Sequence, residues 1–410
     1  MSRNKILFSL FLLIAISVYY LFFYQNKTLK YLPENADVVV LIDVKKLARE
    51  AVFNFATNPS RWFEKSENKD DLFSLRNSGV KIPDFVQIFH LKNSQISEWY
   101  SVLEINNQEE FSIFLKEKKF SVKGEKIFQK NQLYLKIIGD KCLVGTSQKG
   151  FSYLEKIFIK ENTKNYRESN EFIHNTIASI STVSAEKIKT FDVEMYEEEI
   201  VIKNVADSKI FAPLLKKLEQ NQQFLDVELD AKNAKKFAHL FNKKFSDSAQ
   251  IKKLKAIATL EEVNDTIITY GYDDNFNEIE KKTFQKIVQP NYSVSLASEN
   301  TEDSWQYFKN KNWINAENQF TVIPFQPNIV SHSKNEILIE SLRKPLQITK
   351  SQNENYFFLK NSQLIYASFK SITENEKNFL SKIDYIFYGN KAEHYYMKIK
   401  FRKGELPSFF

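Results

Sequence analysis

Histidine and cysteine, the side chains that most often carry chemistry, are few in this sequence and widely spaced. Metal and nucleophilic sites usually place such residues at short, regular spacings, for example two histidines four residues apart on one helix. No two histidines have that spacing, and the single cysteine, Cys142, lies in an apolar run without a neighbouring base to activate its thiol. The sequence therefore predicts no metal ligand and no cofactor, and it predicts Cys142 as a core residue. The histidines are His90, His174, His239, His332 and His394.

Two short segments resemble ligand-binding loops but depart from the patterns that such loops need. Asp273–Glu278 is acidic like a calcium loop, yet the Gly and the Glu required at the sixth and twelfth positions are missing. Gly145–Gly150 holds the residues of a phosphate-binding loop in the wrong order. We predict a turn that caps a following charged helix at the first segment, a helix cap at the second, and no catalytic residue. Carboxylates that converge only in the folded chain stay open as acid–base groups.

An apolar segment near the amino terminus predicts a membrane anchor. Ile6–Tyr24 contains no charge, Pro or Gly, and at about 1.5 Å per residue a helix of this length spans close to the ~30 Å hydrocarbon core. A cleaved signal peptide would have a shorter apolar region that ends in small residues, which are absent here. We predict a cytoplasmic N-tail at residues 1–5, a transmembrane anchor at 6–24, a polar stalk at 25–34 and a body on the periplasmic side of the bacterial inner membrane.

The composition indicates a folded body without a nucleic-acid surface. The 410 residues are 43% hydrophobic and 27% charged, which is typical of globular chains and predicts roughly two or three domains. The net charge of +7 includes Arg3 and Lys5 ahead of the anchor, and no long run of basic residues follows. Binding to nucleic acid needs a basic face, so we predict no nucleic-acid partner.

Periodicity predicts alternating strands and helices in the body. Asp37–Ile42 is a β-branched apolar run of strand length, Asp43 stands where an N-cap belongs, and apolar residues then recur at helical spacing to Phe55. Further strand pairs follow, among them a hairpin through Gly139-Asp140. We predict an α+β fold of largely antiparallel sheets with flanking helices, preceded by one N-terminal transmembrane helix.

The order of predicted elements recurs, which indicates an internal duplication. The segment that follows residue 224 repeats the strand, the aspartate and the helix of the opening unit, with VELDAKNAKKFAHLF beside LIDVKKLAREAVF. Two predicted strands, Ala256–Glu261 and Thr266–Tyr272, then repeat the predicted strand pair Phe85–Leu91 and Glu98–Ile105 of the first half. We predict a first α+β repeat domain at residues 35–206 and a second at 224–403.

Two segments together resemble a known family. YLPENADVVVLIDVKKL, at residues 31–47, and CLVGTSQKGFSYLEKI, at residues 142–157, are similar to segments of the uncharacterised bacterial envelope proteins grouped as the DUF3352-like family. The resemblance covers about the first 160 residues and implies a single N-terminal anchor with an extracytoplasmic α+β body. It implies no catalytic residue.

These observations lead to one principal hypothesis of function and two alternatives. We expect a non-enzymatic, membrane-anchored module that binds a protein or another component of the cell envelope. The first alternative is an enzyme, such as a hydrolase, whose site forms only in three dimensions; a cleft with buried titratable groups would favour it. The second is a binder of lipid or another apolar ligand, which a large apolar cavity would favour.

Overall fold

The computed structural model describes residues 23–57, 78–159, 171–184, 187–204, 208–240, 250–323, 327–344, 346–348, 354–361 and 374–405. The chain divides into two compact units, the first ending at Met195 and the second running from Tyr196 to Pro407. The boundary therefore falls before the end of the predicted first repeat domain at residue 206. Each unit is described below by itself.

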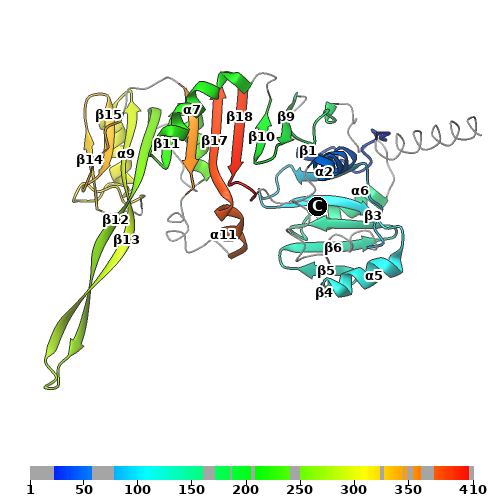
Figure 1. Cartoon of the computed structure of the whole chain (residues 1–410), viewed down its shortest axis with the longest axis horizontal. Coiled ribbons are helices and arrows are strands. Elements are labelled where there is room, and N and C mark those ends of the chain that lie inside the picture. Colours follow the sequence, from blue (N-terminus) through cyan, green and yellow to red (C-terminus); the bar gives the residue numbers. More distant parts are fainter. Residues whose placement is uncertain are drawn as a thin grey trace, which may run out of the picture. The chain divides into compact units, whose positions relative to one another are not determined.

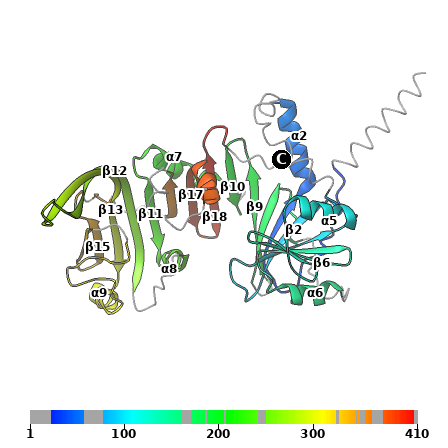
Figure 2. The ribbon, with the colours of Figure 1, turned by 90° about the horizontal axis from the view of Figure 1, so that it is seen from below.

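The first unit is built on one antiparallel sheet of nine strands (Figures 1 and 2). The strands are β1 (Ala36–Asp43), β2 (Phe85–Leu91), β3 (Trp99–Glu104), β4 (Ser121–Gly124), β5 (Ile127–Lys130), β6 (Leu133–Ile138), β7 (Lys141–Gly145), β8 (Ala178–Ser184) and β9 (Lys187–Met195). Their order across the sheet is β9-β8-β1-β2-β3-β7-β6-β5-β4.

Apolar residues on both faces of this sheet are covered by helices. Successive side chains of a strand point to opposite faces, so Val102 and Leu103 on β3 belong to two different core clusters. The first cluster includes α6 (Phe151–Ile159) and the second includes α5 (Gln108–Glu117). The helix α2 (Val44–Thr57) follows β1 directly, and the carboxylate of Asp43 accepts a hydrogen bond from the backbone N–H of Lys46 at 2.7 Å, as the predicted cap requires.

The segment predicted as a stalk, residues 25–34, lies against the first unit. Leu29 and Leu32 are buried in the same cluster as α6. The ring of Tyr31 packs edge-on against that of Phe158 at 5.8 Å, and its hydroxyl donates to Glu104 at 2.6 Å. The segment therefore packs as part of the folded unit, because burial of its apolar residues is favourable.

The second unit is also built on nine antiparallel strands. They are β10 (Glu199–Lys203), β11 (Leu225–Asp230), β12 (Ile251–Tyr272), β13 (Glu278–Ser298), β14 (Asn328–His332), β15 (Glu336–Ser341), β16 (Asn355–Lys360), β17 (Ile383–Lys391) and β18 (His394–Phe401). Their order is β10-β18-β17-β16-β11-β12-β13-β15-β14.

Short helices cover parts of the second sheet. The leucines of α7 (Ala212–Gln220) pack with Phe358 and Phe387, and α9 (Thr301–Asn310) packs Trp305 and Phe308 against β14 and β15. The remaining helices are α8 (Ala231–Leu240), α11 (Glu374–Ser381) and a 3-10 turn at Ser208–Ile210. The carboxylate of Asp230 accepts from the N–H of Asn233 at 2.8 Å and so caps α8 in the way that Asp43 caps α2.

The two sheets share a strand order. In the first unit the order β9-β8-β1-β2-β3-β7-β6 matches β17-β16-β11-β12-β13-β15-β14 in the second. In each unit an aspartate-capped helix follows one strand of the set, β1 or β11. Another helix follows β3 in the first unit and β13 in the second. The sequence likeness of Tyr356–Lys360 to the hairpin at Gly139 would pair these segments, but the strand order instead matches β16 with β8.

The predicted α+β class with flanking helices is wrong. Among the described residues, strands contain far more residues than helices do, so the architecture is mostly antiparallel sheet. The largest single error is the charged helix expected after Asp273, where β13 forms instead. Among the described residues no helix is both long and apolar enough to cross a membrane. The anchor predicted at Ile6–Tyr24 lies outside these residues except for its last two.

Candidate functional site

A long hairpin of the second unit extends beyond the rest of its sheet (Figure 1). Strands β12 and β13 pair continuously from Ile251–Ser298 at the root to Tyr272–Glu278 at the tip. Neighbouring strands reach only the root, since β11 pairs no further than Ala258 and β15 no further than Ser293. Residues 260–290, here called the arm, therefore form a two-stranded ribbon with solvent on both faces.

One face of the arm carries a row of exposed apolar side chains. Residues directly opposite each other in an antiparallel pair point to the same face, and the register pairs Thr266 with Phe284, Ile268 with Lys282, Tyr270 with Glu280 and Tyr272 with Glu278. This aromatic face thus presents Ile268, Tyr270, Tyr272 and Phe284, of which the last two are 71% and 74% exposed. The opposite face carries Ile267 and Ile279, which are exposed but not aromatic.

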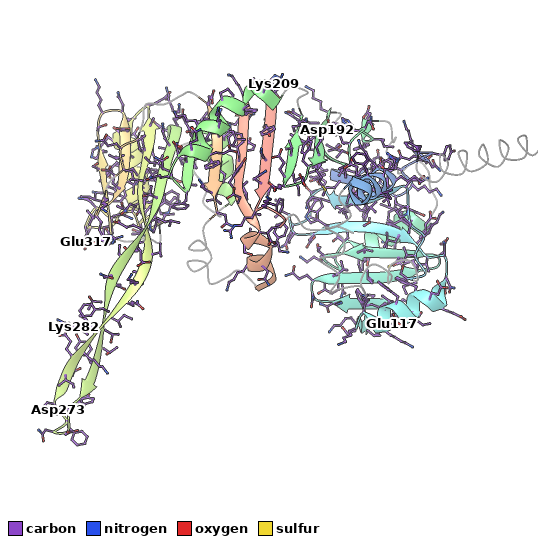
Figure 3. The ribbon with its side chains drawn as sticks, in the orientation of Figure 1. Glu117, Asp192, Lys209, Asp273, Lys282 and Glu317 are labelled. Carbon is purple, nitrogen blue, oxygen red and sulfur yellow. The ribbon has the colours of Figure 1, made fainter. Side chains whose placement is uncertain are left out.

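The tip is a turn organised by one carboxylate. Asp273 Oδ1 accepts hydrogen bonds from the N–H groups of Asn275 and Asn277 at 2.9 and 2.8 Å, and Oδ2 accepts from the side-chain amide of Asn277 at 3.0 Å. These bonds, first those of Asn277 and then that of Asn275, hold the pKa of Asp273 below its usual value. The carboxylate is thus fully used by the turn, which confirms the predicted turn at Asp273–Glu278 although a strand follows it (Figure 3).

Phe276 occupies a highly exposed position of this turn in an unfavourable conformation. Its side chain is 87% exposed and its φ is +61°, in the left-handed region that bulky residues rarely adopt. The left-handed conformation costs roughly 1–2 kcal/mol for a residue with a side chain, and an exposed Phe recovers none of that cost by burial. Folding alone does not favour Phe at this position.

The tip is also strongly acidic. Residues 270–280 contain Asp273, Asp274, Glu278 and Glu280 and no Lys or Arg. Lys281 and Lys282 follow directly; Lys282 lies 3.2 Å from Glu280, and Lys286 pairs with Glu262 at 2.7 Å closer to the root. The arm therefore combines aromatic rings with net negative charge at its far end.

Of the residues singled out in the sequence, Asp273–Glu278 belongs to the arm, and the others form no common site within the described part of their own units. Cys142 is fully buried, and this burial raises the pKa of its thiol to about 12, as the predicted core position requires. Gly150, before α6, donates its N–H to the hydroxyl of Tyr100 at 3.0 Å. His174 contacts Asp192 at 2.8 Å, and the ring of His332 lies 4.5 Å from that of Trp305. No group of three metal-binding side chains occurs within the described ranges.

His90 belongs to a cluster with the connectivity of a hydrolase triad. Its Nδ1 lies 2.7 Å from Asp37 Oδ1 and its Nε2 lies 3.0 Å from Ser94 Oγ. An irregularity in the β1–β2 register between Ala36 and Val38 places Asp37 beside the ring. The sequence does not reveal the cluster, since Asp37 and His90 are 53 positions apart.

The hydrogen bonds of this cluster do not activate Ser94. Nε2 also lies 2.9 Å from the carbonyl oxygen of Gln95, which can only accept, so Nε2 carries a proton there. The hydroxyl of Ser94 donates to the carbonyl oxygen of Leu91 at 2.7 Å. A general base needs a free lone pair directed at the hydroxyl, so this arrangement instead ties the β2–β3 turn to β1.

The His90 cluster predicts a pH-dependent stability. Burial alone would lower the pKa of His90, but the hydrogen bonds to Asp37 and Gln95 and the charges of Asp37 and Glu98 outweigh it and raise the pKa. The folded state therefore binds the proton more tightly than the unfolded chain, so the stabilisation is complete below the ordinary pKa of about 6.5 and is lost as the pH rises through the raised value.

We expect Asp37→Asn to flatten this dependence, because burial then opposes protonation without the carboxylate. The urea midpoint of the wild-type chain should fall between about pH 5.5 and about pH 8.5 by more than that of the variant. NMR of histidine labelled with carbon-13 gives the pKa of His90 directly. Parallel curves of urea midpoint against pH for the two proteins would contradict the role of Asp37 in raising the pKa of His90.

No family model, curated protein or solved structure matches this chain. The sequence predicts the strand Thr266–Tyr272, which is rich in Thr, Ile and Tyr, but not the arm, since β12 continues through Glu262–Asp265 and pairs with β13.

Proposed function

We propose that this protein is a non-enzymatic binding module that contacts a partner protein through the arm. The observation that carries the proposal is the row of exposed aromatic side chains that ends at Phe276. Contiguous exposed apolar surface on a folded protein often marks an interaction site, and aromatic side chains supply much of the binding energy at protein interfaces. Location in the bacterial envelope and attachment through Ile6–Tyr24 stay predictions from the sequence.

The charge of the tip specifies the chemistry of the partner. Residues 270–280 contain Tyr270, Tyr272 and Phe276 together with four carboxylates, of which, among the described residues, only Glu280 pairs with a cation, Lys282. Such a surface repels phosphate groups and therefore disfavours nucleic acid and anionic lipid as partners. It attracts Lys and Arg, whose cations also bind favourably over aromatic rings. The partner is accordingly a protein with an exposed basic patch.

Variants of the two arm faces test this proposal. The aromatic-face variant is Tyr272→Ser with Phe284→Ser, and the matched control is Ile267→Ser with Ile279→Ser on the opposite face. After crosslinking in intact cells that make the full chain, mass spectrometry should find a protein that the wild type and the control capture. We expect the aromatic-face variant to capture it at least roughly tenfold less, the effect of about 1.4 kcal/mol. Equal capture by all three chains, or no specific capture by the wild type, would overturn the proposal.

Phe276→Gly separates binding from stability. Glycine adopts positive φ without strain, so the substitution should leave the free energy of unfolding unchanged or raise it by up to about 1 kcal/mol. Capture of the partner should nevertheless fall by roughly tenfold or more, because the exposed ring is lost. The two effects are read from urea unfolding and from the same crosslinking assay. A loss of stability together with unchanged capture would show that Phe276 serves the fold instead.

A further inference from the structure

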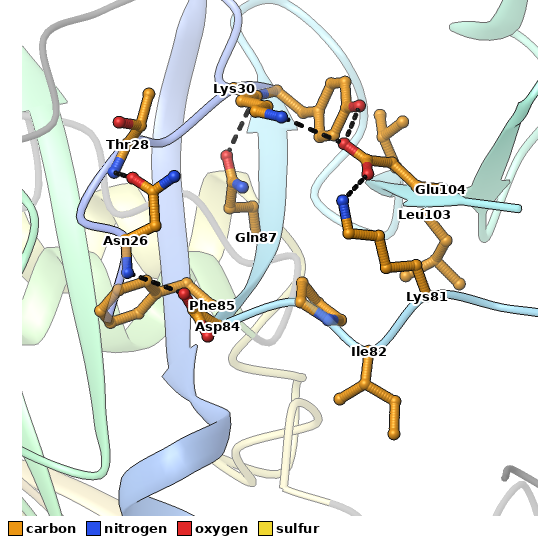
Figure 4. A pocket seen from close by; sticks show the side chains of 13 residues that line it. Asn26, Thr28, Lys30, Lys81, Ile82, Asp84, Phe85, Gln87, Leu103 and Glu104 are labelled. Carbon is orange, nitrogen blue, oxygen red and sulfur yellow. Dashed lines mark hydrogen bonds and ion pairs between the residues drawn. The ribbon is translucent and has the colours of Figure 1, made fainter. Parts of the chain in front are cut away.

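A cavity of about 220 Å³ in the first unit is lined by opposite charges that balance (Figure 4). Lys30 and Lys81 line it together with Asp84 and Glu104, and Glu104 already accepts from Lys81 at 2.6 Å. This cavity therefore favours neither an anion nor a cation. The surface that specifies a partner more closely is an outer edge of the arm.

The two outer edges of the arm differ in charge. The β12 edge, residues 266–272, reads TIITYGY and contains no charged residue and no Pro, whereas the β13 edge, residues 278–286, contains three lysines and two glutamates. Natural sheets protect exposed edges with charged side chains, Lys above all, and with Pro or a bulge. The register of the β12 edge has no bulge, and its Thr, Ile and Tyr residues favour strands. Of the two edges, that of β12 is therefore the one open to the addition of another strand.

The backbone groups of the β12 edge point away from β13 at every second residue. In an antiparallel pair, residues that exchange two backbone hydrogen bonds alternate with residues that exchange none. At the tip, Asp273 donates its N–H to the carbonyl oxygen of Asn277 at 3.0 Å, so odd-numbered residues of β12 bond β13 and even-numbered ones point outward. The root agrees, because the carbonyl oxygen of Ala258 accepts from the N–H of Phe224, which precedes β11, at 3.0 Å. The outward groups of residues 266–272 pair with no described strand.

We propose that two copies of this chain associate by pairing their β12 edges in antiparallel orientation, with the two-fold axis at Thr269. This register places Ile268 of each copy opposite Tyr270 of the other. It likewise places Thr266 opposite Tyr272, so every pair that exchanges backbone bonds joins two even-numbered residues. Pairs of aromatic and β-branched side chains stabilise antiparallel sheets. The two arms then form one four-stranded sheet.

The neighbouring strand leaves room for this pairing. β11 occupies the same edge of β12 at the root but pairs no further than Ala258. In the proposed register Phe276, at the tip of one copy, lies opposite Glu262 of the second copy and so does not reach β11. The two β13 edges lie on the outside of the four-stranded sheet, where their lysines disfavour further strands. The association therefore closes at two copies, as a two-fold interface does.

Pairing at this edge leaves the aromatic face of the arm uncovered. Residues directly opposite each other point to the same face, so the face that carries Tyr270 and Tyr272 continues from one copy into the second. The dimer thus widens the surface proposed to contact a partner protein, but it depends on the backbone of the edge and not on the exposed face. Failure of either proposal would leave the other untouched.

Charge opposes the pairing at its two ends and so predicts how it responds to salt. Asp265 of each copy lies opposite Asp273 of the other, and the paired residues 266–272 contain no cation. Salt screens such like charges, so the dimer should strengthen between about 0.05 M and about 0.5 M salt. Contact between the acidic tip and a basic partner should weaken over the same range, which distinguishes the two associations.

Cysteine crosslinking of the purified full-length chain tests the pairing. In a pair without backbone bonds the Cα atoms lie about 4.5 Å apart, which suits a disulfide, so Thr269→Cys should join two copies under mild oxidation. Cys142 is fully buried in every variant. The matched controls are Thr283→Cys, on the same face at the β13 edge, and Ile267→Cys, which the register places about 13 Å from its own copy. On a non-reducing gel we expect at least roughly tenfold less disulfide dimer from either control.

Proline substitutions in the Thr269→Cys chain test the backbone bonds. Ile268 and Lys282 lie opposite each other, and the N–H of each points away from the hairpin. Ile268→Pro removes a donor of the β12 edge and should lower the yield of disulfide dimer at least roughly tenfold, whereas Lys282→Pro should leave it unchanged. Equal yields from the two proline variants, equal yields from the three cysteine variants, no dimer from Thr269→Cys or a yield that falls with salt would each overturn the proposal.

Discussion

Glu228→Met should lower the free energy of unfolding of the second unit by about 3–5 kcal/mol, the range found when one partner of a buried ion pair is removed. Glu228 on β11 is fully buried. Its carboxylate lies 2.6 Å from the ammonium group of Lys253 and 3.5 Å from that of Lys255. Lys255 is itself only 6% exposed, so the substitution leaves its charge in a poorly hydrated position.

The loss arises more from the buried cation of Lys255, which loses the counter-charge of Glu228, than from the missing contact. In the double variant Glu228→Met, Lys255→Met both buried charges are replaced by apolar side chains, so the desolvation penalty is removed together with the attraction. Lys253 is partly exposed and can be hydrated. We expect the double variant to recover most of the stability that the single variant loses.

Hydrogen exchange of peptides from β11 and β12 measures this stability within the second unit. The control is Glu262→Gln, which removes a carboxylate from the exposed pair with Lys286 on the arm. Surface pairs contribute about 0–1 kcal/mol, so this change should be nearly silent. Equal losses for Glu228→Met and Glu262→Gln would contradict the distinction between buried and exposed charge.

Local signals in the sequence predict the short-range features of this fold well. Asp43 caps α2 as expected, and Asn107 caps α5 by accepting from the N–H groups of Glu109 and Glu110. The hairpin through Gly139-Asp140 forms between β6 and β7. In each of these, the interacting groups lie within a few residues, so composition and spacing contain the needed information.

The arm could not be predicted in the same way, because periodicity reports burial. Glu262–Asp265 reads as a break between two strands, yet β12 runs through it. In a ribbon exposed on both faces, polar residues are hydrated at every position, so no alternation is imposed. The charged stretch after Glu278 resembles a solvated helix for the same reason, and only its pairing with β12 makes it a strand.

The aromatic face of the arm depends on such long-range pairing. Tyr272 and Phe284 share one face because of the hairpin register. The separation of these residues in the chain contains no sign of this arrangement, so a single sequence shows the residues but not the site.

Gly79→Ala should destabilise the first unit by about 3 kcal/mol or more, since it combines backbone strain with a steric clash. Gly79 has φ +69°, and an added Cβ would lie 2.2 Å from the carbonyl oxygen of Asn107 and 2.7 Å from the amide nitrogen of Phe111. Both atoms are backbone of the first turn of α5 and its cap. The carbonyl oxygen of Gly79 also accepts from the N–H groups of Asn106 and Asn107 at 2.8 and 3.1 Å, so displacing it would disturb the start of this helix.

Two other glycines of the same unit separate strain from clash. Gly139 has φ +59° with no neighbouring atom within 4 Å of an added Cβ, so Gly139→Ala should cost only the left-handed conformation, about 1–2 kcal/mol. At Gly124 the φ is not positive and the nearest atom, Ile127 Cδ1, would be 3.8 Å away, so Gly124→Ala should change stability by less than about 0.5 kcal/mol. Pulse proteolysis across a urea gradient, read from peptides of β6 and β7, ranks the three variants. If Gly139→Ala proved as damaging as Gly79→Ala, the close approach of Gly79 to α5 would contribute nothing beyond strain, and the tight contact would not be what fixes this helix to the sheet.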